Sequence, residues 1–385
     1  MKALLAVPRL PGTGHTGDRL RAELHLSALV GAGFEVTLVG GGAAAAPPAI
    51  PGTSRVVAVA MGAGRIPLGL LKAAISGAPL QSALFAGPWR RALSGLSDTF
   101  DLVVVLLPQR LWTHVAPSLP KAPLVLDYVD ALGAAARQAA AEDPALLRRV
   151  YWRIEAARLE GAERESGAAA RARLATTPFD ASRLPGLTAA VGNGVTLDEL
   201  AAGPRGPVVA FTGRLRYRPN LLAARRLLDR IWPAVRREVP EAELRLGGAD
   251  APPDLLAWHG RGGVSVTSPV GAMGPFLRAS RAAAVPVDLG TGTPNKLFEA
   301  FEAGCAVVAS SAAADRAAAG SVRPPVRVAD TDGDFAAALV DYLRHPEAAA
   351  ADGEAGRAFV AAHADRRRCL AALQDGYRRA AGGPT

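Results

Sequence analysis

Residues 282–310 read AAAVPVDLGTGTPNKLFEAFEAGCAVVAS, and this stretch decides the expected fold of the second half of the chain. The apolar run at 282–287 is typical of a buried strand, and a loop of small residues follows it at 290–293. A short helix and a second strand, at 305–309, come next. The stretch is therefore a strand–loop–helix–strand unit of a parallel sheet, and its helix begins at the edge where such sheets bind ligands.

The helix inside this unit carries its own start and stop signals. Thr293 is the expected N-cap, Pro294 the first helical residue, and Gly304 the residue that ends the last turn. Lys296 and Glu299 are three residues apart and share one helix face. A cation and a carboxylate beside exposed backbone amides are suited to hold a diphosphate and a pair of sugar hydroxyls. The pattern predicts a nucleotide-sugar site.

Strand-like and helix-like segments alternate on both sides of a Pro/Gly-rich linker at 201–207. Strands are expected at 3–7, 35–39, 102–107, 124–128, 172–176, 208–212, 243–246 and 264–267, and helices at 19–30, 145–166, 220–239, 275–279 and 334–344. This alternation predicts an α/β protein with two doubly wound, Rossmann-like domains, 1–200 and 208–355. A helix over 356–385 is expected to return to the first domain.

Composition limits the possible partners of the 385-residue chain, whose formal net charge is +9. Nearly all of its 44 basic residues are arginines, and they are scattered rather than clustered with aromatic residues, so no nucleic acid partner is expected. Cys305 and Cys369 form no CxxC pair, which argues against a zinc site and a disulfide framework. The first apolar run ends at Pro8, too short for a signal peptide, and no stretch is long enough to span a membrane. We expect a soluble protein of the cytoplasm, with peripheral contact at the inner membrane face left open.

Two motif matches are rejected. Residues 12–17 fit GxGxxG, but four residues separate the motif from the first strand, and no carboxylate follows the second strand, so an NAD site is not expected. Residues 330–334 resemble the start of a calcium loop, but Phe335 stands where that loop needs glycine. Capping of the helix at 334–344 explains these carboxylates, and no metal site is predicted.

Five pieces of the sequence resemble retaining glycosyltransferase family 4, in the order found in that family. They are GDRLR (17–21), EAARLEGAER (155–164), VGNGV (191–195), FTGRLRYRPNLLAARRL (211–227) and GTPNKLFEAFEAG (292–304). The fourth piece resembles the branch in which a Tyr-x-Pro-Asn run opens the second domain. The resemblance implies the GT-B fold, with two domains facing a cleft. It also implies transfer of a sugar from a nucleotide diphosphate sugar to a hydroxyl acceptor, with retention and without a metal or cofactor.

The resemblance also implies roles for residues of the second domain. Glu299 would bind the ribose hydroxyls of the sugar donor, because a carboxylate can accept both of them. Lys296 and Arg214 would neutralise the leaving diphosphate, which is the main catalytic contribution expected. Gly292 and Thr293 would offer backbone amides to the same phosphates.

Fewer residues are implied in the first domain. Gly14 would let the backbone approach the sugar donor closely. The family places a histidine near the cleft, for which His114 is the first candidate and His15 the second. Asp130, just past a strand end, would orient the acceptor.

The sequence departs from the family at two positions. Thr291 stands where the family has the first glutamate of its Glu-x7-Glu motif, so the usual carboxylate contact to the donor sugar is absent or supplied otherwise. Pro219 replaces the lysine of the usual phosphate clamp, and Lys296, Arg216 or Arg218 would have to take its place. The donor sugar and the nucleotide base are therefore left open.

Several alternatives also stay open. Each of these candidate residues could instead have a purely structural role. His114 could be an ordinary loop histidine and Asp130 a helix cap. Arg214 and Lys296 could belong to surface ion pairs. A sugar-nucleotide epimerase of the same fold would turn over without an acceptor, and a non-catalytic binding protein would have a decayed donor site. The acceptor could be a lipid-linked or cell-envelope glycan or a small secondary metabolite. Trp89-Arg90-Arg91 follows an apolar stretch and is read as an ordinary helix end, with contact to a membrane surface as the alternative.

Overall fold

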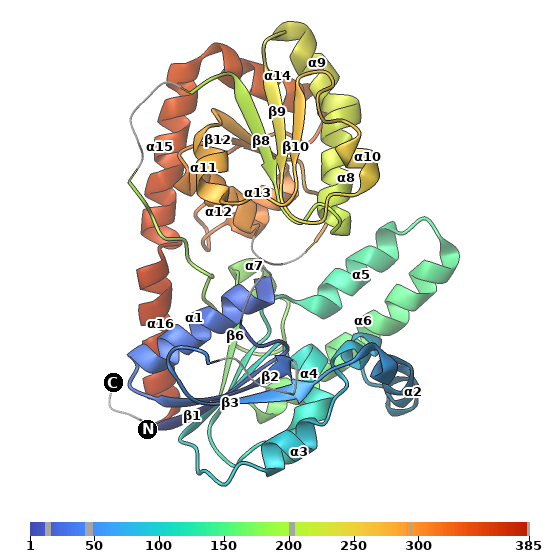
Figure 1. Cartoon of the computed structure of the whole chain (residues 1–385), viewed down its shortest axis with the longest axis vertical. Coiled ribbons are helices and arrows are strands. Elements are labelled where there is room, and N and C mark those ends of the chain that lie inside the picture. Colours follow the sequence, from blue (N-terminus) through green and yellow to red (C-terminus); the bar gives the residue numbers. More distant parts are fainter. Residues whose placement is uncertain (12–16, 43–48, 200–204, 291, 293, 383–385) are drawn as a thin grey trace. The chain divides into compact units, whose positions relative to one another are not determined.

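The computed structural model describes residues 1–11, 17–42, 49–199, 205–290, 292 and 294–382. The chain forms two compact units (Figure 1). The first consists of Met1–Asn193 and Arg367–Thr385, and the second of Gly194–Arg366. The first unit is therefore built from two separate pieces of sequence.

A parallel sheet of seven strands forms the centre of the first unit, in the order β3-β2-β1-β4-β5-β6-β7. The strands are β1 (Lys2–Val7), β2 (Glu35–Gly42), β3 (Thr53–Ala60), β4 (Leu102–Leu106), β5 (Leu124–Asp127), β6 (Ala172–Ala175) and β7 (Ala189–Ala190). The chain continues from β1 to β2 and β3 on one side and resumes at β4 on the other. The switch between β1 and β4 is the feature that defines a doubly wound sheet.

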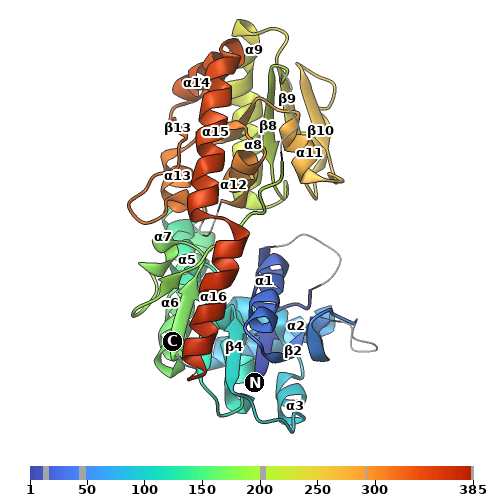
Figure 2. The same ribbon diagram turned by 90° about the vertical axis from the view of Figure 1, so that its left-hand side faces the viewer.

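Helices cover both faces of this sheet. They are α1 (Gly17–Gly31), α2 (Ile66–Ser76), α3 (Trp89–Ser94), α4 (Pro108–Val115), α5 (Leu132–Glu142), α6 (Leu146–Ala169), α7 (Pro178–Ala181) and α16 (Arg366–Ala380), with 3-10 helices η1 (Ala63–Arg65), η2 (Leu80–Phe85) and η3 (Ala116–Ser118). Alternate residues of β1 enter opposite cores. Leu5 packs with residues of α1 and α16, whereas Leu4 packs with residues of η2, α3 and α4. Figure 2 shows α1 and α16 beside this sheet.

A fully buried polar cluster ties α16 to this unit. The Tyr377 hydroxyl contacts Nδ1 of His25, and His25 Nε2 lies 2.5 Å from the Asp127 carboxylate at the end of β5. Arg21 Nε donates to the same carboxylate oxygen at 2.7 Å. Burial alone would raise the pKa of Asp127, but the Arg21 guanidinium and His25 outweigh it and hold that pKa well below its usual range. The cluster therefore pairs its buried charges.

The second unit has a parallel sheet of six strands, in the order β10-β9-β8-β11-β12-β13. The strands are β8 (Val208–Thr212), β9 (Glu243–Gly247), β10 (Val264–Thr267), β11 (Ala282–Val285), β12 (Ala306–Ala309) and β13 (Arg327–Val328). The helices are α8 (Arg218–Arg226), α9 (Trp232–Glu238), α10 (Pro253–Leu256), α11 (Met273–Arg278), α12 (Asn295–Glu302), α13 (Ser311–Ala317), α14 (Asp332–Arg344) and α15 (Pro346–His363). Here the topological switch lies between β8 and β11.

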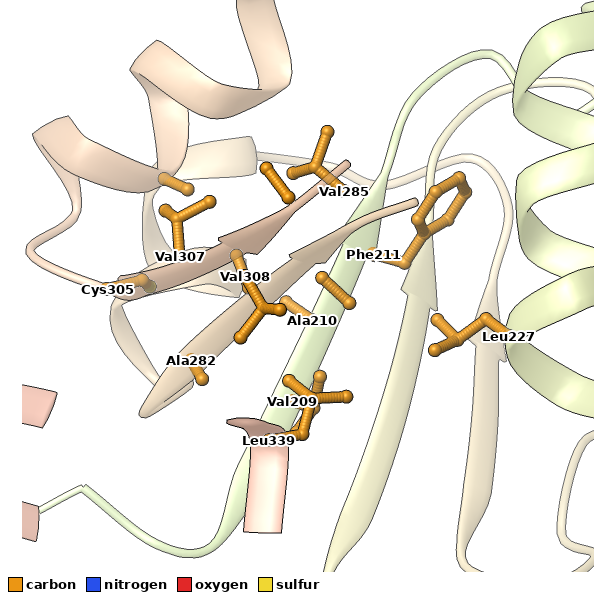
Figure 3. Packing of buried hydrophobic residues seen from close by; sticks show 14 of the residues in the cluster. Val209, Ala210, Phe211, Leu227, Ala282, Val285, Cys305, Val307, Val308 and Leu339 are labelled. Carbon is orange, nitrogen blue, oxygen red and sulfur yellow. The ribbon is translucent and has the colours of Figure 1, made fainter. Parts of the chain in front are cut away.

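Strand residues and helix residues interdigitate in the core of the second unit. Figure 3 shows Val209 of β8 beside Leu339 of α14, and Phe211 facing Leu227, all of them buried. The helix predicted at 220–239 is interrupted: α8 and α9 are joined by a π-helical turn, Leu227–Ile231. Pro233 at the start of α9 has no N–H to donate to the preceding turn, which accounts for this irregularity.

The chain passes from one unit to the other at two places. The first change of unit comes at Gly194, before the linker predicted at 201–207, and the second comes at Arg366, after the predicted start at 356. Val195 pairs with Asp365 in an isolated bridge, which brings these two crossing segments of the second unit side by side. Within the described ranges, no helix is both long and apolar enough to cross a membrane.

Candidate functional site

The predicted site segment forms a strand, a loop and α12, as expected, but the helix starts later than predicted. Asn295 is its first residue, and Pro294 has ψ 72°, outside the helical region. The carbonyl of Pro294 accepts the first bond of the helix, from the Leu297 amide at 2.8 Å, so Pro294 takes the N-cap position predicted for Thr293. Thr293 itself and Thr291 lie outside the described residues.

The end of α12 is confirmed at Gly304, which adopts φ 69°. The Gly304 amide donates to Phe301 at 2.9 Å, and the Cys305 amide donates to Ala300, also at 2.9 Å. These two bonds form a Schellman motif, which requires a left-handed residue at this point. The motif sets where α12 stops and β12 begins.

Lys296 is the centre of the polar arrangement at the switch point of the second sheet. Its ammonium is hydrogen-bonded to Oδ1 of Asn220 and lies 4.9 Å from the centre of the Phe211 ring. Burial lowers the pKa of Lys296 to about 7, while the Glu299 carboxylate opposes this effect and Arg316 adds to it. A desolvated cation at the carboxyl end of parallel strands is typical of a site that binds an anion.

Asn220 joins the two loops that flank the switch point. Its Oδ1 accepts from Lys296, in the segment after β11, and its Nδ2 donates to the Arg214 carbonyl at 3.0 Å, in the segment after β8. Lys296 and Asn220 are 76 positions apart, so this bond depends on the order of the strands. The structure thus brings Lys296 and the backbone of Arg214 together through a residue that was not singled out from the sequence. Its position in the Tyr-x-Pro-Asn run was the signal available.

The Arg214 side chain is directed elsewhere. Its Nε donates to Asp250 Oδ2 at 2.6 Å, and the pair is largely exposed. Arg216 and Arg218 are also exposed, so the half-buried position beside Gly213 is taken by Lys296 rather than by either arginine.

Two glycines allow this loop to approach the neighbouring strand. The Gly213 amide donates to the Gly247 carbonyl at 3.0 Å. A Cβ on Gly248 would lie 1.8 Å from the Gly213 carbonyl oxygen, and Gly248 has φ 154°. Any side chain at position 248 would therefore displace the Gly213 loop that faces Lys296.

Glu299 lies one turn beyond Lys296 on α12. Leu297, Phe298 and Ala300 are buried, whereas Lys296 and Glu299 are partly exposed, so the two charged residues share one face as predicted. Gly292 is buried with φ 79°, in the loop before the helix.

Asp130, in the first unit, is placed at the carboxyl end of β5, directly after Val129, which adopts φ 63°. Burial and the Asp180 carboxylate raise the pKa of Asp130 to about 7, and Arg110 opposes them. Gln109 Nε2 donates to the Asp130 backbone carbonyl at 2.8 Å. Asp180 and Gln109 were not predicted from the sequence. Asp130 thus lies in the segment that follows β5, just past the strand end, as expected.

His114 is placed differently. It lies in the last turn of α4, and its Nε2–H donates to the Ser82 carbonyl at 2.9 Å. Burial lowers the pKa of His114, the bond to Ser82 opposes this, and Lys72 lowers it further. This bond holds η2 against α4, so His114 makes a structural contact, although it stands on a helix and not in the loop that the sequence suggested. Gly14 and His15 lie outside the described residues.

A pocket of about 660 Å³ is also present in the first unit, between α5, α6 and residues 183–185. Glu163 lines it, and Oε1 of Glu163 accepts from the Gly133 amide at 3.1 Å. Burial raises the pKa of Glu163 to about 7. No group of three or more metal-ligating side chains was found in the part of the chain that the structure describes.

Two doubly wound parallel sheets in one chain, with a C-terminal helix that joins the first, are the architecture of the GT-B glycosyltransferases, and the predicted fold is confirmed. The structure is similar to sucrose-phosphate synthase from Thermosynechococcus elongatus (TM-score 0.70, 16% identity, 98% of this chain and 99% of that chain). It is also similar to WaaG, a glycosyltransferase involved in lipopolysaccharide biosynthesis (TM-score 0.65, 15% identity, 96% and 99%). Anabaena Alr3699/HepE in complex with UDP-glucose is a third similar structure (TM-score 0.64, 15% identity, 98% and 99%).

Sequence comparison adds a match in the second unit. Residues 206–345 match the family model described as "Glycosyl transferases group 1". The matched range contains the Gly213 loop, Asn220 and the whole of α12. No curated protein sequence matches the chain.

Proposed function

We propose that the protein is a retaining glycosyltransferase of family 4, which transfers a sugar from a nucleotide diphosphate sugar to a hydroxyl-bearing acceptor. The observation that carries this proposal is the Lys296 ammonium, held by Asn220 at the switch point of the second sheet. The match to the group 1 glycosyltransferase model, over the range that contains both residues, supports it. So does the similarity in fold to HepE, which was solved with UDP-glucose.

In this proposal the second unit binds the nucleotide diphosphate. Lys296 neutralises the diphosphate, assisted by the amide of Gly292 and by Arg214, once a phosphate competes with Asp250 for its guanidinium. Glu299 accepts hydrogen bonds from the two ribose hydroxyls. These residues supply the charge stabilisation, and the proposal includes no metal or other cofactor.

The proposed reaction exchanges one bond at the anomeric carbon for another on the same face. The bond from that carbon to the phosphate oxygen breaks as the bond to the acceptor oxygen forms. The proton of the acceptor hydroxyl passes to the departing phosphate oxygen. Asp130 of the first unit is the proposed orienting residue for the acceptor, a cell-envelope glycan or a secondary metabolite. The proposed setting is the cytoplasm.

The experiment is titration calorimetry with UDP, GDP, ADP and TDP on the wild type and on Glu299→Ala. Selective binding of one nucleotide, weakened about tenfold or more in the variant, is expected, because charge-assisted bonds to the ribose are lost. Glu354→Ala, which removes an exposed carboxylate of α15, is the matched control and should bind normally. Equal binding by Glu299→Ala would remove Glu299 as the ribose anchor, and no binding by the wild type would refute the proposed function.

Turnover distinguishes a transferase from an epimerase. The sugar nucleotide of the base that binds is incubated with and without hydroxyl acceptors, and its products are followed by NMR. Transfer predicts that the glycosidic product appears only with an acceptor and keeps the anomeric configuration of the sugar donor. Conversion of the sugar nucleotide in the absence of acceptor would favour the epimerase instead.

A further inference from the structure

Helix α2 of the first unit has its large and small residues on the opposite sides from an ordinary surface helix. Its buried residues are Gly69 and Ala73, whereas Leu68, Leu71 and Ile75 are 56%, 57% and 79% exposed. The buried side packs closely on η2, since a Cβ on Gly69 would lie 3.1 Å from the Ala83 Cα atom. The apolar side of α2 is thus presented to water, which is the reverse of the usual amphipathic arrangement.

The first turns of α6 show the same property. Leu147, Tyr151 and Ile154 are spaced by four and three residues, so they share one face of the helix, and they are 84%, 39% and 48% exposed. Isolated apolar residues on a surface are common, but two helices with such rows are not.

Hydrogen bonds tie the middle of α6 to the end of α2 and to the start of η2. Arg158 of α6 donates to the Ala74 and Ala78 carbonyls at the end of α2, at 3.4 and 3.3 Å. Glu155 of α6 accepts from the Leu80 amide at 2.8 Å and from the Gln81 amide at 2.9 Å. We name the six side chains Leu68, Leu71, Ile75, Leu147, Tyr151 and Ile154 the α2–α6 apolar surface.

The charged residues of α2, of the turn before it and of residues 146–154 in α6 are all basic. Residues 36–97, which include α2, contain no aspartate or glutamate. Arg65, Lys72 and Arg153 are exposed, and Arg148 is exposed but paired with Asp143. The nearby carboxylates are engaged or lie to the side: Glu155 is buried on two amides, Asp143 is buried and paired with Arg148, and Glu142 ends α5.

We propose that the α2–α6 apolar surface binds the face of an anionic phospholipid membrane. Exposed aliphatic side chains flanked by arginine and lysine, without facing carboxylates, match the two requirements of peripheral binding, which are apolar insertion and attraction to anionic headgroups. A symmetric dimer through this surface would bring its cations against the same cations of the second copy. Trp89 does not take part, because it is fully buried and its Nε1–H donates to Phe85.

The expected loss of membrane binding in each variant follows from the contributions of apolar insertion and of charge attraction. A leucine or isoleucine that leaves water adds about tenfold to the partition coefficient. A basic residue near an anionic leaflet adds about fivefold, and this part falls with salt. Removing three aliphatic side chains should therefore weaken binding by about a hundredfold or more. Removing two basic residues should weaken vesicle binding by about tenfold or more at low salt, and should have little effect at high salt.

The test is co-sedimentation of the full chain with phosphatidylcholine vesicles that contain or lack phosphatidylglycerol. The apolar variant carries Leu71→Ser, Ile75→Ser and Leu147→Ser, and its control carries Leu187→Ser, since Leu187 is 91% exposed before β7. The charge variant carries Lys72→Gln and Arg153→Gln. Because these side chains are exposed, thermal melting of each variant should match that of the wild type.

We expect the wild type and Leu187→Ser to bind vesicles that contain phosphatidylglycerol, and both surface variants to be impaired. Absence of wild-type binding, or equal binding by the apolar variant, would overturn the proposal. A dimer in lipid-free sedimentation that the apolar variant dissociates would also overturn it, by assigning the surface to a second copy. The proposal is independent of the proposed transferase function, because nucleotide binding by the apolar variant, measured separately, should be unchanged.

Discussion

Nucleotide binding should take up a proton from solution, and Lys296 should be its destination. In the free protein the pKa of Lys296 is about 7, so at pH 8 only about one tenth of the molecules carry the ammonium. A diphosphate beside Nζ favours the charged form and raises this pKa again. Binding of a nucleoside diphosphate at pH 8 should therefore take up about 0.9 proton, and at pH 6 about 0.1.

Calorimetry measures this uptake directly. The apparent binding enthalpy is determined in two buffers of different ionisation enthalpy, and the difference between them gives the number of protons transferred. The affinity should also fall by up to about tenfold per pH unit above pH 7, until the pKa of the bound state is reached. Lys296→Met should bind more weakly and take up no proton at pH 8. Equal uptake by Lys296→Met and the wild type would refute this account of the site.

The same shift has a consequence for stability. The folded-state pKa of Lys296, about 7, is below the value of 10.5 in the unfolded chain, so the unfolded chain binds more protons between these two pH values. The free energy of unfolding should therefore rise with pH from about 7 to 10.5. The difference, 10.5 − 7, is about 3.5 units, and at 1.4 kcal/mol per unit it sets an upper limit of about 5 kcal/mol. Thermal melting should show Lys296→Met to be more stable than the wild type at pH 7, with a gain that shrinks towards pH 10.5. A gain that does not vary with pH would contradict this reasoning.

Three further predictions concern other parts of the chain. Gly248→Ala should displace the Gly213 loop, because its Cβ would meet the Gly213 carbonyl. Calorimetry should then show nucleotide binding weakened at least about tenfold. Binding with wild-type affinity would show that the loop is not part of the site. Asp127→Asn should destabilise the protein by about 3–5 kcal/mol in urea unfolding at pH 7, because it leaves the Arg21 guanidinium buried without its counter-charge. Since the pKa of Asp127 is lowered in the folded state, this stabilisation should be present above its unfolded pKa near 3.8 and lost as the pH falls below that value. If the difference in unfolding free energy between the wild type and Asp127→Asn stayed constant down to strong acid, the ion pair would not be its cause. Glu163→Gln should raise the melting temperature at pH 8 more than at pH 4. The pKa of Glu163 is raised to about 7, so the folded wild type loses stability as the pH rises from about 4.5 to 7. An equal change of melting temperature at both pH values would contradict burial of this carboxylate.

The strands could be predicted wherever large apolar residues are buried. Val208–Thr212 begins and ends as expected, because a parallel strand that is covered on both faces is mostly apolar. Val264–Thr267, an edge strand, is also as expected, because its two buried valines alternate with the less buried Ser265 and Thr267. Helix α2 was not predicted, and the reason is physical. Sequence periodicity detects helices that bury large side chains, whereas α2 buries Gly69 and Ala73 and exposes its leucines.

The candidate site could be predicted in part. Lys296 and Glu299 follow from local spacing on one helix, which sequence patterns report directly. The contacts that set the properties of Lys296 do not, because Asn220 and Phe211 reach it only after β8 and β11 become neighbours in the sheet. The ion pair of Arg214 with Asp250 could not be predicted for the same reason, since 36 positions separate the two residues in the sequence.

The discontinuous first unit has a consequence for the order in which the chain folds during synthesis. Residues 194–366 leave the ribosome as one uninterrupted piece and can complete their own core before the chain ends. The first unit, although its first 193 residues are made earlier, lacks Leu373 and Tyr377 of its core until α16 emerges. His25 and the apolar face of its sheet then remain uncovered while the second unit is being made. The part of the protein that is synthesised first is thus the part that finishes folding last, and a chain truncated after residue 366 would leave its first unit, not its second, unfinished.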